Sequence, residues 1–201
     1  MEGRTSKDHP LQIAPLKTTG AGLIGMTLCP GKKDQAALTG AWNRDLDTDL
    51  QAILDWGAKV LVTLMEDYEL RQLGVSEIGE RASELGLEWY HLPIQDVSIP
   101  DSEFEKAWEE VSPILHKHLD AGEHVVLHCR GGLGRTGTIA ARMLVETGET
   151  PQNALHRVRV ARVGTVETEE QEEYILSLGD VPDDEGASAD DAGAPLDTGL
   201  Y

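Results

Sequence analysis

The 201-residue sequence has few cysteines, few aromatic residues and no long apolar segment. Its two cysteines provide neither a disulfide framework nor the ligand spacing of a zinc site, which fits a protein of a reducing compartment. No apolar run reaches the length of a signal-peptide core or of a membrane span. We therefore expect a cytoplasmic protein.

Basic residues are also scarce. The chain has 17 Lys and Arg against 36 Asp and Glu, a formal net charge of −19. Such a charge repels phosphate backbones and anionic lipids at long range, so we expect neither a nucleic-acid nor a membrane partner. An anionic substrate would therefore need a local positive site. Residues 180–201 contain no Lys or Arg and are predicted to form an acidic, disordered tail.

The hydrophobic pattern predicts one α/β domain over residues 21–179, preceded by an extended arm, residues 1–20. Runs such as "KVLVTLME" and "HVVLHC" are typical of strands buried on both faces. They alternate with amphipathic segments that end at glycine, as helices do. This alternation predicts a central, mostly parallel sheet flanked by helices on both faces.

The segment "HVVLHCRGGLGRTG", residues 124–137, places Cys129 between a predicted strand and a predicted helix. Ligands of open α/β sheets bind beyond the carboxyl ends of the strands. Glycines let successive N–H groups converge on one point, and a helix N-terminus adds a positive dipole. The alternative is an ordinary buried cysteine at a strand end. The anion-binding residues are predicted to be Arg130, Gly131, Gly132, Leu133, Gly134 and Arg135.

Arg135 completes a C-x5-R spacing from Cys129. Its planar guanidinium can hold two phosphate oxygens at once. The same positive field would stabilise a thiolate at Cys129. These features predict phosphoryl transfer with sulfur as the nucleophile, without a metal or another cofactor.

"HCRGGLGRTG" resembles the phosphate-binding loop of the cysteine-dependent protein tyrosine and dual-specificity phosphatases, H-C-x-x-G-x-x-R-[ST]-G. "LCPGKK", "LPIQDVSIPD" and "VETEEQEEY" are similar in order and spacing to the kinase-associated phosphatase (cyclin-dependent kinase inhibitor 3) branch and its bacterial relatives. The resemblance covers residues 22–178. It implies a protein tyrosine phosphatase-like fold and hydrolysis of phosphotyrosine, phosphoserine or phosphothreonine in a phosphorylated protein, and we expect a monomer.

The resemblance also implies a role for four residues. Cys129 would take the phosphoryl group as a phosphocysteine, and Arg135 would clamp the phosphate oxygens. Thr136 would donate a hydrogen bond to the sulfur as it leaves in the second step. Asp96 would be the general acid that protonates the leaving oxygen, whereas Asp101 is predicted to cap a helix.

Three supporting residues follow from the same resemblance. His128 would shape the loop through hydrogen bonds to its backbone, or would simply be packed. Gln171 stands where the family has the second glutamine of a water-positioning "QTxxQ" pattern. Glu167 replaces the first glutamine with an acid, which leaves its role open between water positioning and an ordinary surface charge.

The pair Cys29 and Lys32 raises a smaller question. Cys29 could form a bridge with Cys129, and Lys32 and Lys33 could meet a phosphorylated partner. The alternative for both is a strand end followed by a solvated turn.

Other functions remain in competition. A phosphatase of a small-molecule or inositol-type phosphate monoester is the main alternative, although the loop offers only Arg130 where a polyphosphate site would have lysines. A sulfurtransferase would not need the Arg-Thr-Gly that follows the loop. An inactive phosphate-binding module would be expected to lack Cys129, Arg135 or Asp96, and all three are present.

Overall fold

The fold is built on a five-stranded sheet. A computed structural model describes residues 3–37 and 40–179, and its strand order is β1-β2-β7-β5-β6. The parallel strands are β2 (Leu23–Leu28), β7 (His124–Cys129), β5 (Ala58–Thr63) and β6 (Glu88–His91). Only β1 (Ala14–Lys17) pairs antiparallel, with β2. The prediction of a mostly parallel sheet is confirmed.

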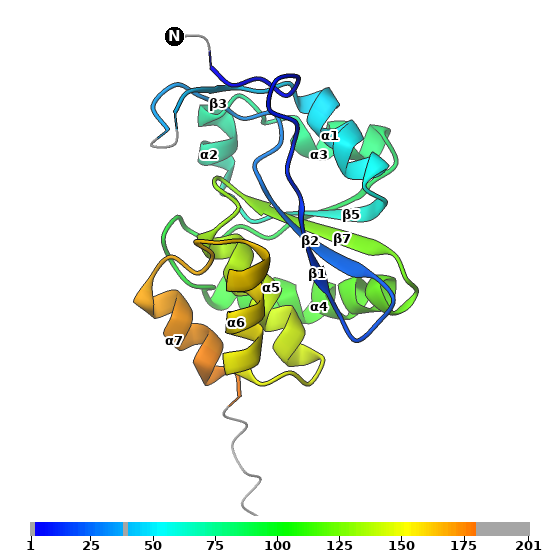
Figure 1. The fold of residues 1–201 in the computed structure, drawn as a ribbon, viewed down its shortest axis with the longest axis vertical. Coiled ribbons are helices and arrows are strands. Elements are labelled where there is room, and N and C mark those ends of the chain that lie inside the picture. The colour runs from blue at the N-terminus through cyan, green and yellow to red at the C-terminus, as the bar shows by residue number, and fades with distance from the viewer. Residues whose placement is uncertain (1–2, 38–39, 180–201) are drawn as a thin grey trace, which may run out of the picture.

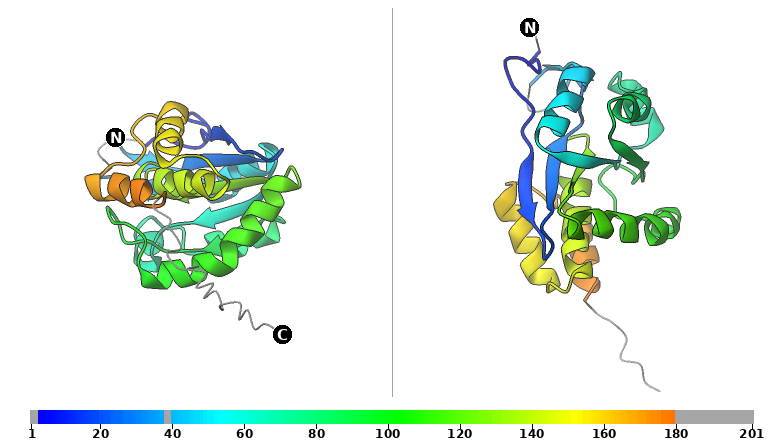
Figure 2. Two further views of the ribbon diagram at one scale, coloured as in Figure 1. Left: turned by 90° about the horizontal axis from the view of Figure 1, so that it is seen from below. Right: turned by 90° about the vertical axis from the view of Figure 1, so that its right-hand side faces the viewer.

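Helices cover both faces of the sheet (Figures 1 and 2). One face carries α1 (Leu46–Asp55), α2 (Asp67–Gln72) and α3 (Ile78–Glu84). The other face carries α4 (Ser102–Asp120), α5 (Gly134–Glu146), α6 (Pro151–Ala161) and α7 (Glu169–Ser177). A short hairpin, β3 (Lys33–Asp34) and β4 (Trp42–Asn43), precedes α1. None of the described helices is both long and apolar enough to cross a membrane.

The predicted strands and helix ends have the expected local causes. Val125, Val126 and Leu127 are consecutive residues of β7 and are fully buried, because helices cover the strand on both faces. Gly57 and Gly122 follow α1 and α4 with φ of +94° and +84°. This left-handed conformation is available to glycine at little steric cost, so the predicted helix stops are confirmed.

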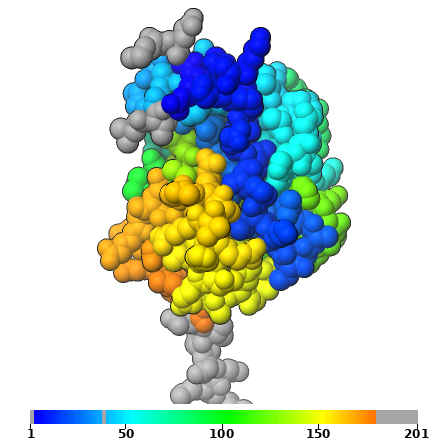
Figure 3. Space-filling view, in the orientation of Figure 1, coloured from blue at the N-terminus to red at the C-terminus, as the bar shows by residue number. Residues whose placement is uncertain are grey.

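The N-terminal segment is part of the domain rather than a separate arm. Residues 14–17 form the edge strand β1, and Leu16 is buried. Arg157 of α6 donates a hydrogen bond to the carbonyl oxygen of Lys17 at 2.5 Å. Figure 3 shows this segment packed against the body of the protein. The predicted arm therefore contributes both a strand and core contacts, and the predicted tail lies outside the described residues.

Candidate active site

The phosphate-loop cysteine lies at the centre of the carboxyl edge of the sheet. Cys129 is the last residue of β7, which lies between β2 and β5, and its exposure is 3%. The following loop passes so close to β2 that a Cβ on Gly132 would lie 2.3 Å from the carbonyl carbon of Thr27. Gly132 also has a φ of +70°. Both facts require glycine there, as the sequence predicted for a tightly curved loop.

Arg135 is held in place by an acid from another element. Its Nη1 and Nη2 donate to the two carboxylate oxygens of Glu69 at 2.6 and 2.9 Å. Nη1 also donates to the carbonyl oxygen of Ile94 at 3.0 Å, and Nη2 to Oδ1 of Asp96 at 2.8 Å. Burial acts to lower the pKa of Arg135, but the hydrogen bonds to Glu69 and the charge of Cys129 raise it above its ordinary value. The guanidinium is therefore charged and fixed.

Glu69 is the residue that sequence reasoning missed. It lies on α2, a six-residue helix that the periodicity did not predict, and its side chain is 1% exposed. The sequence contains 36 acidic residues, so residue type alone could not identify Glu69 as part of the site. The usable signal was its place six residues after the end of β5, the strand beside β7, because segments that follow neighbouring parallel strands meet at one edge of the sheet.

Asp96 faces the phosphate loop. It lines a cavity of about 430 Å³ together with the loop residues Arg130, Gly131 and Leu133 and with Glu167. Its side chain is 46% exposed while it pairs with Arg135. The carboxyl group proposed to act as an acid thus lies in the cavity that the loop lines.

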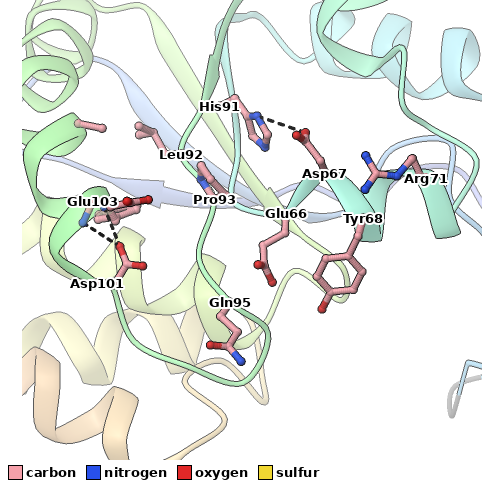
Figure 4. Close-up of a pocket in the computed structure, with 12 residues that line it drawn as sticks. Glu66, Asp67, Tyr68, Arg71, His91, Leu92, Pro93, Gln95, Asp101 and Glu103 are labelled. Atoms are coloured by element: carbon pink, nitrogen blue, oxygen red, sulfur yellow. Dashed lines mark hydrogen bonds and ion pairs between the residues drawn. The ribbon is translucent and has the colours of Figure 1, made fainter.

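Asp101 faces a different and larger cavity, about 610 Å³, which is also lined by Gln95, the residue before Asp96 (Figure 4). Its Oδ1 accepts hydrogen bonds from the backbone N–H groups of Glu103 and Phe104 at 3.0 and 2.8 Å. Asp101 is therefore the N-cap of α4, as predicted.

Thr136 and His128 are both fully buried beside the loop. The hydroxyl of Thr136 has no hydrogen-bond partner among the described residues. His128 Nε2 lies 2.7 Å from Thr63 Oγ1, which also accepts from Trp89 Nε1 at 2.9 Å. Burial lowers the pKa of His128 to about 3, so the ring is neutral. A hydrogen bond with the backbone of Cys129 acts in the opposite direction on this pKa, so the ring contacts the loop backbone as well as Thr63.

Glu167 and Gln171 connect α7 to the site. Glu167 Oε2 accepts from the N–H of Gly134 at 2.7 Å. Gln171 is buried, its Oε1 accepts from the N–H of Glu167 at 3.0 Å, and its Nε2 donates to the carbonyl oxygen of Ser98 at 3.1 Å. The segment that carries Asp96 is thus joined to the phosphate loop through α7.

Two basic side chains donate hydrogen bonds to carbonyl oxygens of the phosphate loop. Lys32 Nζ donates to the carbonyl oxygen of Arg130 at 3.3 Å and lies 5.4 Å from the centroid of the Trp42 ring. Arg162 Nη2 donates to the carbonyl oxygen of Gly131 at 3.2 Å. Burial lowers the pKa of Lys32. The expectation of a solvated turn is wrong for Lys32, whose exposure is 5%, whereas its place in the lining of the cavity beside the loop leaves contact with a phosphorylated partner a prediction.

Cys29 lies next to Cys129 in space although it precedes Cys129 by 100 positions in the sequence. Leu28, the last residue of β2, pairs with Cys129 of β7, so Cys29 directly follows the neighbouring strand, and both cysteines are free thiols. Burial raises the pKa of the Cys29 thiol well above its usual range. Cys29 is therefore a neutral buried thiol.

This arrangement defines a class of enzyme. A cysteine at the end of a central parallel strand, a glycine loop, a buried arginine at the start of the next helix and an aspartate on a facing segment are the parts of a cysteine-dependent phosphatase of the protein tyrosine and dual-specificity type. Enzymes of this class act through a phosphocysteine.

The family is shown by sequence comparison. The model of the family Tc-R-P, described as "Polymorphic toxin system, DSP-PTPase phosphatase", matches residues 39–149, more than half of the chain. The chain belongs to this family. The match includes Glu69, Asp96 and the whole phosphate loop, and it ends before Glu167.

Individual relatives agree with this assignment. Cyclin-dependent kinase inhibitor 3 of Rattus norvegicus is 26% identical over 185 residues, 89% of this chain and 84% of that protein. The uncharacterized protein MJECL20 of Methanocaldococcus jannaschii is 36% identical over 87 residues, 43% of this chain and 56% of that protein. The predicted resemblance to the kinase-associated phosphatase branch is confirmed.

Solved structures show the same fold. Kinase-associated phosphatase, with its catalytic cysteine changed to serine, superimposes with a TM-score of 0.74 at 23% identity, covering 84% of this chain and 93% of that one. Tk-PTP in its active form gives a TM-score of 0.60 at 28% identity, covering 78% and 90%. The predicted protein tyrosine phosphatase-like fold is confirmed.

Proposed function

We propose that this phosphatase hydrolyses single phosphate esters on tyrosine, serine or threonine side chains of proteins through a phosphocysteine on Cys129. The observation that carries the proposal is the state of Arg135. Its Nη1 donates to Glu69 and to the carbonyl oxygen of Ile94, and its Nη2 donates to Glu69 and to the half-exposed Asp96. Its Nε donates to none of the described residues. A phosphate can take Nε and Nη2 as a bidentate pair and displace only Asp96.

In the first step the Cys129 sulfur attacks phosphorus and the ester oxygen leaves. The loop N–H groups and Arg135 stabilise the charge that builds on the three remaining phosphate oxygens. Asp96, released from Arg135 and protonated, gives its proton to the leaving oxygen. The dephosphorylated side chain then departs with that proton.

In the second step a water attacks the phosphocysteine, its proton passes to the Asp96 carboxylate, and inorganic phosphate and the thiolate are formed. The buried Thr136 hydroxyl, which has no partner among the described residues, is available to donate to the sulfur that is expelled. Gln171 would support this step indirectly, since it ties the segment that carries Asp96 to α7.

The charges around the cavity favour a single phosphate. The ionisable residues that line the cavity are two basic and three acidic ones, Lys32, Arg130, Asp34, Asp96 and Glu167. Asp34 pairs with Arg130 at 2.9 Å, so the charge of that arginine is already balanced. A substrate with a second phosphate, such as an inositol phosphate, would therefore meet little additional positive charge.

We also propose that the enzyme acts in the cytoplasm as a monomer. A thiolate nucleophile requires a reducing environment, and both cysteines are free thiols.

The test has two parts. Para-nitrophenyl phosphate should be hydrolysed in the presence of a chelator, orthovanadate should inhibit, and Cys129→Ser should abolish turnover. Phosphopeptides and inositol phosphates are then compared as substrates of the wild-type enzyme. Loss of turnover in chelator would refute the thiolate mechanism, and a higher kcat/KM for inositol phosphates would establish the alternative substrate class.

A further inference from the structure

One donor of the phosphate loop is already occupied by the protein's own carboxylate. The N–H of Gly134, the residue before Arg135, donates to Glu167 Oε2 at 2.7 Å. Gly134 is also the first residue of α5, where the helix dipole favours negative charge. The contact is therefore charge-assisted and lies at the positive end of the phosphate cradle.

We propose that Glu167 is a resident anion of the phosphate cradle, which the phosphate group must displace from the N–H of Gly134 and which weakens the binding of inorganic phosphate, the reaction product. The proposal rests on the proposed function, because it assumes that the loop binds the phosphate of the substrate. It gives Glu167 a role different from the positioning of water.

The local structure is built for this contact. A Cβ on Gly134 would lie 2.6 Å from Glu167 Oε2, so only glycine lets the carboxylate approach. Val166 has a φ of +62°, a strained conformation for a β-branched residue, and it turns the chain immediately before Glu167. The backbone N–H of Glu167 is then fixed by Gln171.

A bound phosphate and the Glu167 carboxylate compete for the same hydrogen-bond donor, the N–H of Gly134. The loop binds phosphate oxygens through its N–H groups, and a phosphate that takes the N–H of Gly134 brings its negative charge against Glu167. Glu167 lines the same cavity as Asp96 and the loop. It is also an exposed residue, so its side chain can turn into water when phosphate enters. The Glu167 carboxylate thus lowers the affinity of the loop for phosphate without blocking access to the cavity.

The experiment measures the affinity of inorganic phosphate for the wild type and for Glu167→Gln by isothermal titration calorimetry, and its inhibition constant against para-nitrophenyl phosphate. Glutamine keeps the shape and the acceptor oxygen and removes the charge. We expect phosphate to bind about tenfold more tightly to the variant. Glu170→Gln, which removes an exposed charge from the first turn of α7, should change the affinity by less than about twofold.

Ionic strength provides a second measurement. Because Glu167 is exposed, its repulsion is screened by salt, and the difference between wild type and Glu167→Gln should shrink from about 0.05 M to about 1 M sodium chloride. Glu167→Ala, which removes the contact as well as the charge, should also bind phosphate more tightly. Unchanged melting temperatures would show that the variants are folded.

Phosphate binding that is equal or weaker in Glu167→Gln would overturn the inference. If phosphate affinity is unchanged and only the breakdown of the phosphocysteine slows, Glu167 positions water and the proposal is wrong. The binding comparison can be repeated on Cys129→Ser, which has no turnover. Failure of the proposed function would instead appear as a wild-type enzyme without vanadate-sensitive turnover.

Discussion

Replacing Glu69 by glutamine tests whether a buried ion pair fixes the phosphate-binding arginine. The side chains of Arg135 and Glu69 are 2% and 1% exposed, so the variant would leave the guanidinium charge largely unbalanced in the interior. Removal of one partner of such a pair costs about 3–5 kcal/mol of folding free energy. Arg135 keeps the Ile94 carbonyl and Asp96, and glutamine can still accept one hydrogen bond, so we expect about 2–3 kcal/mol.

The same change should impair catalysis, because a displacement of the arginine by about 1 Å can lower the rate by about 10². Urea unfolding gives the stability change, and kcat/KM for para-nitrophenyl phosphate gives the catalytic one. The matched control is Glu84→Gln, which removes the same charge from an exposed pair with Arg81 and should cost less than about 1 kcal/mol without a kinetic effect. A Glu69→Gln enzyme within about 0.5 kcal/mol of the wild type, with unchanged kcat/KM, would refute the reasoning.

Three further predictions concern the acid, the leaving sulfur and the helix that carries Arg135. Asp96→Asn should lower kcat for phenyl phosphate by about 10²–10⁴ and flatten the basic limb of the pH profile, whereas Asp101→Asn should mainly lower the melting temperature. Thr136→Ala should give a rapid burst of leaving group followed by slow turnover; an equally slow first turnover would make Thr136 structural. Burial acts to raise the pKa of Glu146 from 4.5, but hydrogen bonds, led by His116, lower it to about 2. Its stabilisation is therefore present above pH 4.5 and lost as the pH falls through about 2. Glu146→Gln should thus lower stability by about 1–2 kcal/mol at neutral pH, measured by urea unfolding, and a deficit that persists at pH 2 would contradict this.

The long elements of the fold were predictable because their signals are local. The apolar run of β7 and the glycines that end α1 and α4 lie within a few residues of the features they determine. In contrast, α2 has only six residues and gives no periodicity, and β1 is a strand only because β2 offers it an edge. A short element takes its conformation from its neighbours in space, which a sequence window does not contain.

The residues of the candidate site also fall into those determined by local sequence and those brought together by the fold. Cys129 and Arg135 lie within seven consecutive residues, so their geometry is a property of one loop and could be predicted. Glu69 and Lys32 act through contacts with that loop, yet each follows a different strand, β5 and β2 respectively. Both strands neighbour β7. The strand order therefore explains why these two segments flank the loop, whereas packing alone decides that Glu69 reaches the guanidinium and that Lys32 reaches a carbonyl oxygen.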